Sequence, residues 1–164
     1  MADVLTIAAA DGFEFAAYHA GVSDARRGGL VICHAIWGVT PHLRALAETY
    51  AEIGYETLVP NLFARQGQDF AERDTDPALF DRQNRFGEQT GWGAETLDRV
   101  QATIDALRPP VFALGFCFGG TTAWLAAARC TGLSAVACYY GGEIIHNVAE
   151  QAKDRHALLP AQST

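Results

Sequence analysis

One six-residue segment, Gly115–Gly120 with the sequence GFCFGG, constrains the fold more than any other part of the chain. The apolar run Val111–Leu114 precedes it, and a helix-forming run at 121–128 follows it. Strand, tight turn and helix form the setting of a nucleophile elbow, where flanking glycines leave room for a strained residue. Cys117 has the turn position, in which a thiolate acts as a nucleophile. The alternative is an ordinary buried cysteine.

The composition favours one domain with a large core. The chain has 164 residues, 49% of them hydrophobic, and a formal net charge of −7. This charge argues against binding to nucleic acid. No apolar stretch is long enough to span a bilayer, and residues 1–6 lack the pattern of a signal peptide. The four cysteines form no C-x-x-C pair, so we expect reduced thiols, a cytoplasmic protein and no metal site.

The apolar pattern predicts strands that alternate with helices. A helix begins at Pro41 and stops at Gly54, and the polar segment 61–91 contains one short helix near 77–85. The other predicted strands and helices are strands at 4–9, 13–19, 30–34, 57–59, 111–114 and 133–139, and helices at 93–107 and 119–129. Such alternation indicates a parallel sheet with helices on both faces.

Residues 1–164 are interpreted as a single domain whose C-terminal side is incomplete. Residues 143–164 form an irregular tail that carries no strand signal after Lys153. The strand at 133–139 would then present an unpaired edge beside apolar side chains. We therefore expect self-association through this edge, or a tail that covers it.

Acyl chemistry at Cys117 requires hydrogen-bond donors for an oxyanion. One donor is the N–H of Phe118, at the positive end of the following helix. The other comes from the loop after an adjacent strand, residues 34–39, where the Ile36 N–H is the candidate. The alternative interpretation of Ile36-Trp37-Gly38 is a strand-end turn with a packed aromatic side chain.

Taken together, these motifs resemble the dienelactone hydrolase family of α/β-hydrolases. The resemblance implies a three-layer α/β/α fold with a mostly parallel sheet that here lacks its last strands. It also implies hydrolysis of small esters or lactones by a Cys-His-Asp triad, without a metal or cofactor. Cys117 corresponds to the nucleophile, and Ile36 and Phe118 to the oxyanion donors. The matching segments, in the family's order, are residues 36–39, Gly54-Tyr55, residues 60–65, Gly115–Gly120 and residues 139–142.

Two positions near the predicted site depart from the family pattern. Ala35 stands where the family commonly has a glutamate that helps to control the thiol, and His34 precedes it. His34 is either a partial substitute for this glutamate or a hydrogen-bonded structural residue. Asn61 replaces an aspartate that often follows the proline.

The candidates for the triad acid and base lie in the tail. Asp154 opens a segment that resembles the family's acid-bearing loop, and His146 and His156 are the only histidines after Cys117. The alternatives are a chance match for Asp154 and a solvated His156. The base that the family implies would lie beyond Thr164.

The long connection 61–91 offers candidates for substrate binding. Arg82 and Arg85 lie where the family has a carboxylate-binding arginine, and Trp37 lies beside the predicted oxyanion donor. The alternative is that both arginines are solvated. Two further hypotheses remain for the whole chain: a truncated, catalytically impaired member that binds a small molecule or a partner, and a redox-sensing thiol protein.

Overall fold

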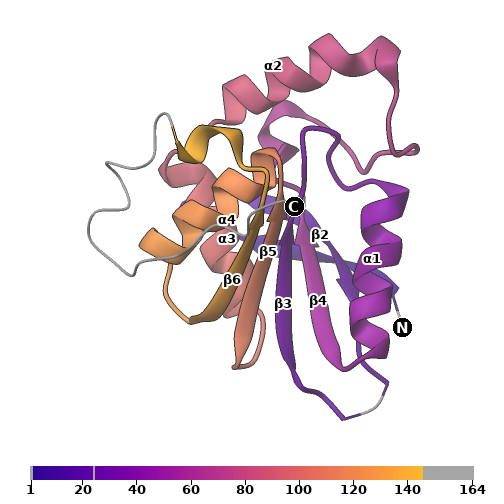
Figure 1. The fold of residues 1–164 in the computed structure, drawn as a ribbon, viewed down its shortest axis with the longest axis vertical. Coiled ribbons are helices and arrows are strands. Elements are labelled where there is room, and N and C mark those ends of the chain that lie inside the picture. The colour runs from indigo at the N-terminus through magenta and orange to yellow at the C-terminus, as the bar shows by residue number, and fades with distance from the viewer. Residues whose placement is uncertain (1, 24, 146–164) are drawn as a thin grey trace.

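The computed structural model describes residues 2–23 and 25–145 (Figure 1). A six-stranded sheet forms its centre, with the strand order β1-β2-β4-β3-β5-β6. Strands β3 to β6 run parallel, whereas β1 and β2 pair antiparallel with their neighbours. The strands are β1 Ala2–Ala8, β2 Glu14–Ala20, β3 Gly28–Cys33, β4 Tyr55–Pro60, β5 Val111–Phe116 and β6 Leu133–Tyr139. The mostly parallel sheet predicted from the sequence is confirmed.

Helices cover both faces of the sheet. Helix α1, Pro41–Glu52, packs on one face, while α3, Ala94–Asp105, and α4, Phe118–Arg129, pack on the other (Figure 1). Helix α2, Phe80–Thr90, lies beyond the carboxyl ends of the strands. The predicted three-layer α/β/α architecture is therefore present.

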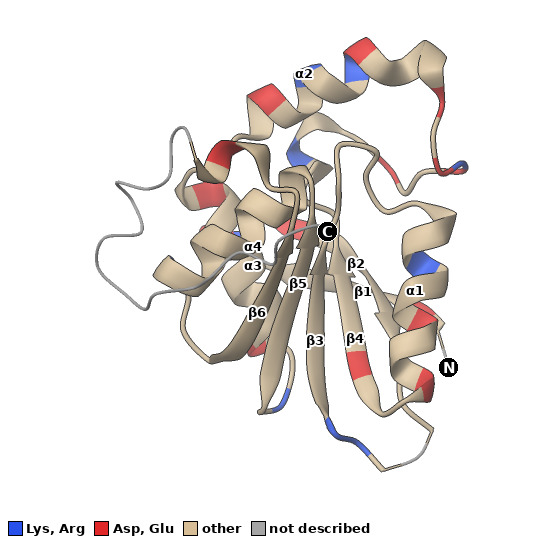
Figure 2. Ribbon diagram, viewed as in Figure 1, with Lys and Arg blue, Asp and Glu red and all other residues tan. Residues whose placement is uncertain are grey.

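The central strand β3 supplies both halves of the core. All six of its residues are buried. Val31 and Cys33 belong to the cluster packed against α3 and α4, whereas Leu30 and Ile32 belong to the cluster packed against α1. This division follows from the two-residue period of a strand, which sends successive side chains to opposite faces. Figure 2 shows the charged residues mainly on helices and loops, and β3, β5 and β6 carry none.

The connection before α2 differs from its predicted form. The Asp76 carboxylate accepts the Ala78 N–H at 3.0 Å, and Pro77–Leu79 forms a short 3-10 turn. Helix α2 then continues past the predicted end at 85 and stops before Gly91, whose φ is 55°. The result is a longer helix placed above the strand ends.

The α1 face of the sheet is covered only in part by the described residues. Helix α1 packs on β2 and β4, and an apolar groove of ≈460 Å³ runs beside it over β5 and β6. Tyr55, Phe112, Ala137 and Tyr139 are among its lining residues. Strand β6 forms one edge of the described sheet. Of the predicted irregular tail 143–164, residues 143 and 144 belong to the 3-10 turn Gly142–Ile144, and 146–164 lie outside the described residues.

Candidate active site

Cys117 lies at a strained turn between β5 and α4. Its φ of 54° and ψ of −117° are backbone angles that residues other than glycine rarely adopt. The Cys117 N–H donates to the Tyr139 carbonyl at 3.0 Å. Its own carbonyl accepts the N–H groups of Gly120 and Thr121 at 2.9 and 3.2 Å. The strained elbow that the glycine spacing predicts is therefore present.

The glycines near Cys117 are required by contact between backbones. A Cβ on Gly115 would lie 1.9 Å from the Gly119 carbonyl oxygen, and a Cβ on Gly119 would lie 2.0 Å from that of Cys33. Real Cβ atoms do not come this close, so neither position accepts a side chain without movement. Helix α4 consequently begins directly against the end of β3, and its first N–H groups face the region beside the thiol.

The loop after β3, residues 34–40, lies next to the elbow. The Ala35 carbonyl accepts the Gly38 N–H at 3.1 Å, so Ile36 is inside a tight turn. Gly38 has a φ of 80°, which favours glycine. Among the described residues, the Ile36 N–H donates to no backbone carbonyl. This N–H is therefore available to a ligand.

His34 is fully buried and joins two loops. Its Nδ1 lies 2.7 Å from the Ala35 carbonyl oxygen, and its Nε2 accepts the Leu62 N–H at 3.0 Å. The ring packs edge-on against Phe63, with the two centroids 4.7 Å apart. Burial lowers the pKa of His34 to about 4, which keeps the ring neutral near pH 7. Both nitrogens are bonded to backbone, so the geometry favours the structural interpretation over control of the thiol.

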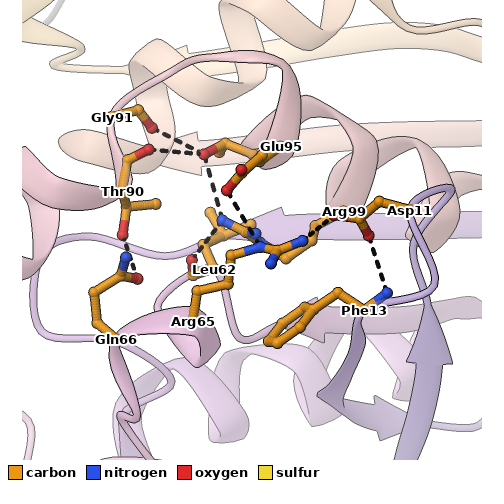
Figure 3. Close-up of polar contacts among 10 residues, drawn as sticks. Asp11, Phe13, Leu62, Arg65, Gln66, Thr90, Gly91, Glu95 and Arg99 are labelled. Atoms are coloured by element: carbon orange, nitrogen blue, oxygen red, sulfur yellow. Dashed lines mark hydrogen bonds and ion pairs between the residues drawn. The ribbon is translucent and has the colours of Figure 1, made fainter.

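Arg99 on α3 is a buried arginine that the sequence analysis does not single out. Its Nη2 donates to the Leu62 carbonyl at 3.1 Å and to Thr96 Oγ1 at 3.4 Å (Figure 3). Burial and the neighbouring Arg65 lower the pKa of this guanidinium. Arg65 itself pairs with Asp11 in the turn between β1 and β2. The buried cation holds the loop after β4 from the side of α3.

Asn61 fixes the same loop from within. Its side-chain nitrogen donates to the Gln68 carbonyl at 2.6 Å, and its side-chain oxygen accepts the Phe63 N–H at 3.1 Å. An ionised aspartate accepts hydrogen bonds but donates none. The replacement of aspartate by Asn61 therefore has a local reason, because the Gln68 carbonyl needs a donor.

A cleft of ≈410 Å³ opens beside the thiol, and Ile36, Cys117 and Phe118 all line it. Helix α2 closes one side, because a Cβ on Gly87 would be in van der Waals contact, at 3.7 Å, with carbon atoms of Ile36 and Phe118. Trp92 stacks on Phe118 at 5.0 Å, and its indole N–H donates to the Phe118 carbonyl at 3.2 Å. The nucleophile candidate and both predicted oxyanion donors thus share one cleft.

The similarity of this chain to known proteins extends over nearly its whole length. The model of the dienelactone hydrolase family matches residues 15–161. The chain belongs to the dienelactone hydrolase family. Carboxymethylenebutenolidase of Rhodococcus opacus is 33% identical over 114 residues, which cover 67% of this chain and 42% of that protein. A Synechocystis protein named "Putative carboxymethylenebutenolidase" is 33% identical over 124 residues, which cover 71% of this chain and 49% of that protein.

A solved structure from the same family supports the fold. The crystal structure of a "Putative Dienelactone Hydrolase" from Klebsiella pneumoniae matches with a TM-score of 0.70 and 27% sequence identity. The match covers 85% of this chain and 59% of that chain. The chain spans about half the length of the curated relatives that it matches.

The substrate-binding residues that the family resemblance implies do not line the cleft beside Cys117. Trp37 and Arg82 line a neighbouring pocket of ≈500 Å³ instead. Arg82 lies over the ring of Phe86, 5.6 Å from its centroid. Arg85 is exposed on α2. The indole that contacts Phe118 belongs instead to Trp92, which is not among the residues predicted from the sequence.

The proposed acid and base of the family triad, Asp154 and His156, lie outside the described residues, as does His146. The described histidines are His19, His34 and His42, and none of them lines the cleft. Its ionisable lining groups are the thiol and the carboxyl groups of Glu88 and Glu143.

The other three cysteines lie in less reactive surroundings. Burial raises the pKa of the Cys33 thiol, that of Cys130 to about 12 and that of Cys138 to about 11. All four thiols are unpaired. Within residues 2–23 and 25–145, no group of three His, Cys, Asp or Glu side chains is arranged to hold a metal ion. Nor does any helix of this part have the length and apolar character needed to cross a membrane.

Proposed function

We propose that this chain hydrolyses ester or lactone bonds in small molecules, with Cys117 as the nucleophile. The observation that carries the proposal is the strained Cys117, in one cleft with Ile36 and Phe118. A strained residue at the start of a helix, beside unbonded N–H groups, is the arrangement that acyl transfer requires. Membership of the dienelactone hydrolase family supports the same reaction class.

The proposed reaction has two steps. The Cys117 thiolate attacks the ester carbonyl, and the carbonyl oxygen becomes an oxyanion that accepts the Ile36 and Phe118 N–H groups. Collapse of this intermediate expels the alcohol and leaves a thioester on Cys117. Water then attacks the thioester through a second oxyanion in the same position, which releases the acid and restores the thiol. Each step needs a proton acceptor, and the candidates in this chain are His156 with Asp154.

The charge of the cleft favours neutral substrates. The Glu88 carboxylate lines it, whereas Arg82 and Arg85 do not. The Glu88 carboxylate would repel an anionic acyl group there. We therefore propose that a neutral ester acylates Cys117 faster than an ester that carries a free carboxylate. Carboxylate recognition by Arg82 and Arg85 is a separate proposal. For Arg82 it concerns the neighbouring pocket, which this residue lines.

The decisive experiment compares acylation by p-nitrophenyl acetate with acylation by the mono-p-nitrophenyl ester of succinic acid, which carries a free carboxylate. We expect release of p-nitrophenol and an acetyl group on Cys117 by mass spectrometry, with slower reaction of the charged ester. Cys117→Ala should abolish the reaction. Cys130→Ala is the matched control, because Cys130 is partly buried and lies outside the cleft. An equal rate for Cys117→Ala and the unchanged chain would contradict the proposal.

A second candidate function is binding without efficient turnover. It is favoured by the absence of a histidine from the cleft lining within the described residues. In that case the thioester forms but is hydrolysed slowly, because the share of the rate supplied by a positioned base, on the order of 10²–10⁴, is lost. A burst of one p-nitrophenol per chain, followed by a slow steady state, would identify this behaviour.

We also propose that the protein is cytoplasmic and self-associates. Four unpaired thiols support a reducing compartment. Self-association would join the β6 edges of two copies, because this strand carries no charge that would oppose pairing. Sedimentation velocity over a concentration series tests it, with Ala137→Lys expected to shift the chain towards monomer. A monomer at every concentration would overturn it.

A further inference from the structure

The Ala35–Ile36 peptide unit is held by two hydrogen bonds on its carbonyl side. The carbonyl of Ala35 accepts the Gly38 N–H at 3.1 Å and lies 2.7 Å from Nδ1 of His34. The N–H of Ile36 belongs to the same planar peptide unit. Whatever fixes the Ala35 carbonyl therefore also fixes the direction of the Ile36 N–H. This is the N–H that the proposed function assigns to the oxyanion.

The hydrogen bonds of His34 define its tautomer. The Leu62 N–H can only donate, so Nε2 must be an acceptor without a proton. The neutral ring then carries its proton on Nδ1, which donates to the Ala35 carbonyl. The lowered pKa of the buried ring agrees with this single neutral state. A carbonyl that accepts two hydrogen bonds polarises its peptide, so that the N–H on the other side becomes a stronger donor.

The chain of contacts extends behind His34. The Leu62 carbonyl accepts a hydrogen bond from the buried guanidinium of Arg99, and Asn61 holds the same loop through Gln68. The partner of Nε2 is therefore fixed by a loop that has its own anchors. His34 transmits this rigidity from the end of β4 to the turn after β3.

We propose that His34 is a positioning residue for the oxyanion site, which it serves by holding and polarising the Ala35–Ile36 peptide. The inference rests on the proposed function, because the oxyanion exists only if Cys117 reacts with a carbonyl. Acylation of the thiol passes through that oxyanion, whereas alkylation by iodoacetamide displaces iodide from a saturated carbon and forms none. The ratio of the two rates at Cys117 therefore isolates the oxyanion site from thiol reactivity and from folding.

Two variants separate the two hydrogen bonds of His34. In His34→Asn, the amide nitrogen takes the place of Nδ1 and can still donate to Ala35. In His34→Gln, the amide reaches the Leu62 N–H but no longer holds the Ala35 carbonyl. We expect His34→Gln to lower the ratio of acylation to alkylation by about tenfold or more, since loss of a whole oxyanion donor costs about 10²–10³. His34→Asn should recover most of the ratio. Ile104→Val, in the core away from the cleft, serves as a stability control and should leave the ratio unchanged.

The outcomes separate the inference from the proposed function. A ratio of acylation to alkylation that is unchanged in His34→Gln, whether both rates fall equally or neither falls, would overturn the positioning role. Acylation of the unchanged chain would still support the proposed function. If the unchanged chain is not acylated at Cys117, the proposed function fails. The peptide contact is then decided by NMR: the Ile36 amide resonance should shift in His34→Gln and return towards its original position in His34→Asn. An Ile36 resonance that is the same in all three chains would overturn the contact itself.

Discussion

Two turns meet at the same edge of the sheet, and they are held by different forces. The elbow after β5 is fixed by contact between backbones, with no space for a Cβ at Gly115 or Gly119. The loop after β3 is fixed by side-chain hydrogen bonds, from His34 to the Ala35 carbonyl and from the Gln68 amide to the Trp37 carbonyl. At the elbow, a single added Cβ atom would clash with the backbone and force it to move. In the loop, the loss of one hydrogen bond lowers the free energy of unfolding by about 1 kcal/mol.

This difference separates the two parts of the proposed chemistry. The position of the nucleophile cannot be adjusted by small steps, because a side chain added at Gly115 or Gly119 moves the backbone of α4 or β3. The position of the second oxyanion donor is adjustable, because the loop can lose one bond and keep its fold. Sequence changes in the loop are therefore expected to alter reactivity at a small cost in stability, and changes at the elbow to alter the fold.

The largest effect is expected for Gly119→Val. Its Cβ would lie 2.0 Å from the Cys33 carbonyl oxygen, so we expect a loss of stability of about 4 kcal/mol or more, or no folded protein. Gly93→Ala is the control, because nothing lies within 4 Å of its added Cβ and its φ is −78°. Urea unfolding measures both. Equal midpoints for the two variants would show that the elbow has room to spare.

The second prediction tests the exposure of the elbow through its thiol. Limiting iodoacetamide at pH 8 should label Cys117 before Cys130, as read by mass spectrometry of peptides. Burial raises the Cys130 pKa from 9.0 to about 12, which lowers its thiolate fraction by about 10³. Preferential labelling of Cys130 would remove the basis for a nucleophile at the elbow.

The third prediction concerns pH and the His34 hydrogen bonds. The folded pKa is about 4 and the ordinary value is 6.5, so between these two pH values the unfolded chain binds a proton that the folded chain does not. Stability contributed by neutral His34 is therefore complete above pH 6.5 and falls with pH, by about 2 kcal/mol at pH 5 and about 3 kcal/mol at most. Urea unfolding at pH 7 and pH 5 measures this loss. In His34→Asn the slope should flatten, and an unchanged slope would assign the acid sensitivity to other groups.

The smallest effect is expected where the loop joins α1. Thr40 Oγ1 accepts the Leu43 N–H at 3.2 Å and caps the helix. Thr40→Ala should cost about 1 kcal/mol in the free energy of unfolding. Thr49→Ala, at an exposed position within α1, should cost less. Chemical denaturation that ranks Thr49→Ala above Thr40→Ala would show that the cap does not stabilise this junction.

The elbow was predictable from the sequence because its cause is local. The glycines at 115, 119 and 120 are separated from Cys117 by fixed numbers of residues, so the strained turn follows from spacing alone. The same holds for α1, which begins at Pro41 and ends before Gly54, a glycine with a φ of 97°.

Contacts between distant segments were not predictable. Arg99 looks like a residue of the polar face of its helix, and its burial depends on a carbonyl of Leu62 that lies 37 positions earlier. Trp37 directly follows the predicted oxyanion donor in the sequence, whereas in the structure it is Trp92 that contacts Phe118. The placement of α2 decides between them, since Trp92 follows this helix and reaches Phe118. The local sequence pattern does not predict where α2 packs after the long connection that precedes it.

The buried cysteines on two strands allow the opening of the sheet to be measured from the rate at which a thiol reagent reacts with each of them. Cys33 lies on central β3 and Cys138 on edge strand β6, and a reagent reaches either thiol only after the backbone around it has opened. Strand β6 pairs on one side only within the described sheet, so its opening can be local. The labelling rate of Cys138 should then report local opening of β6. The slower labelling rate of Cys33 should report opening of the whole sheet. The two native thiols of one chain therefore report two different opening rates.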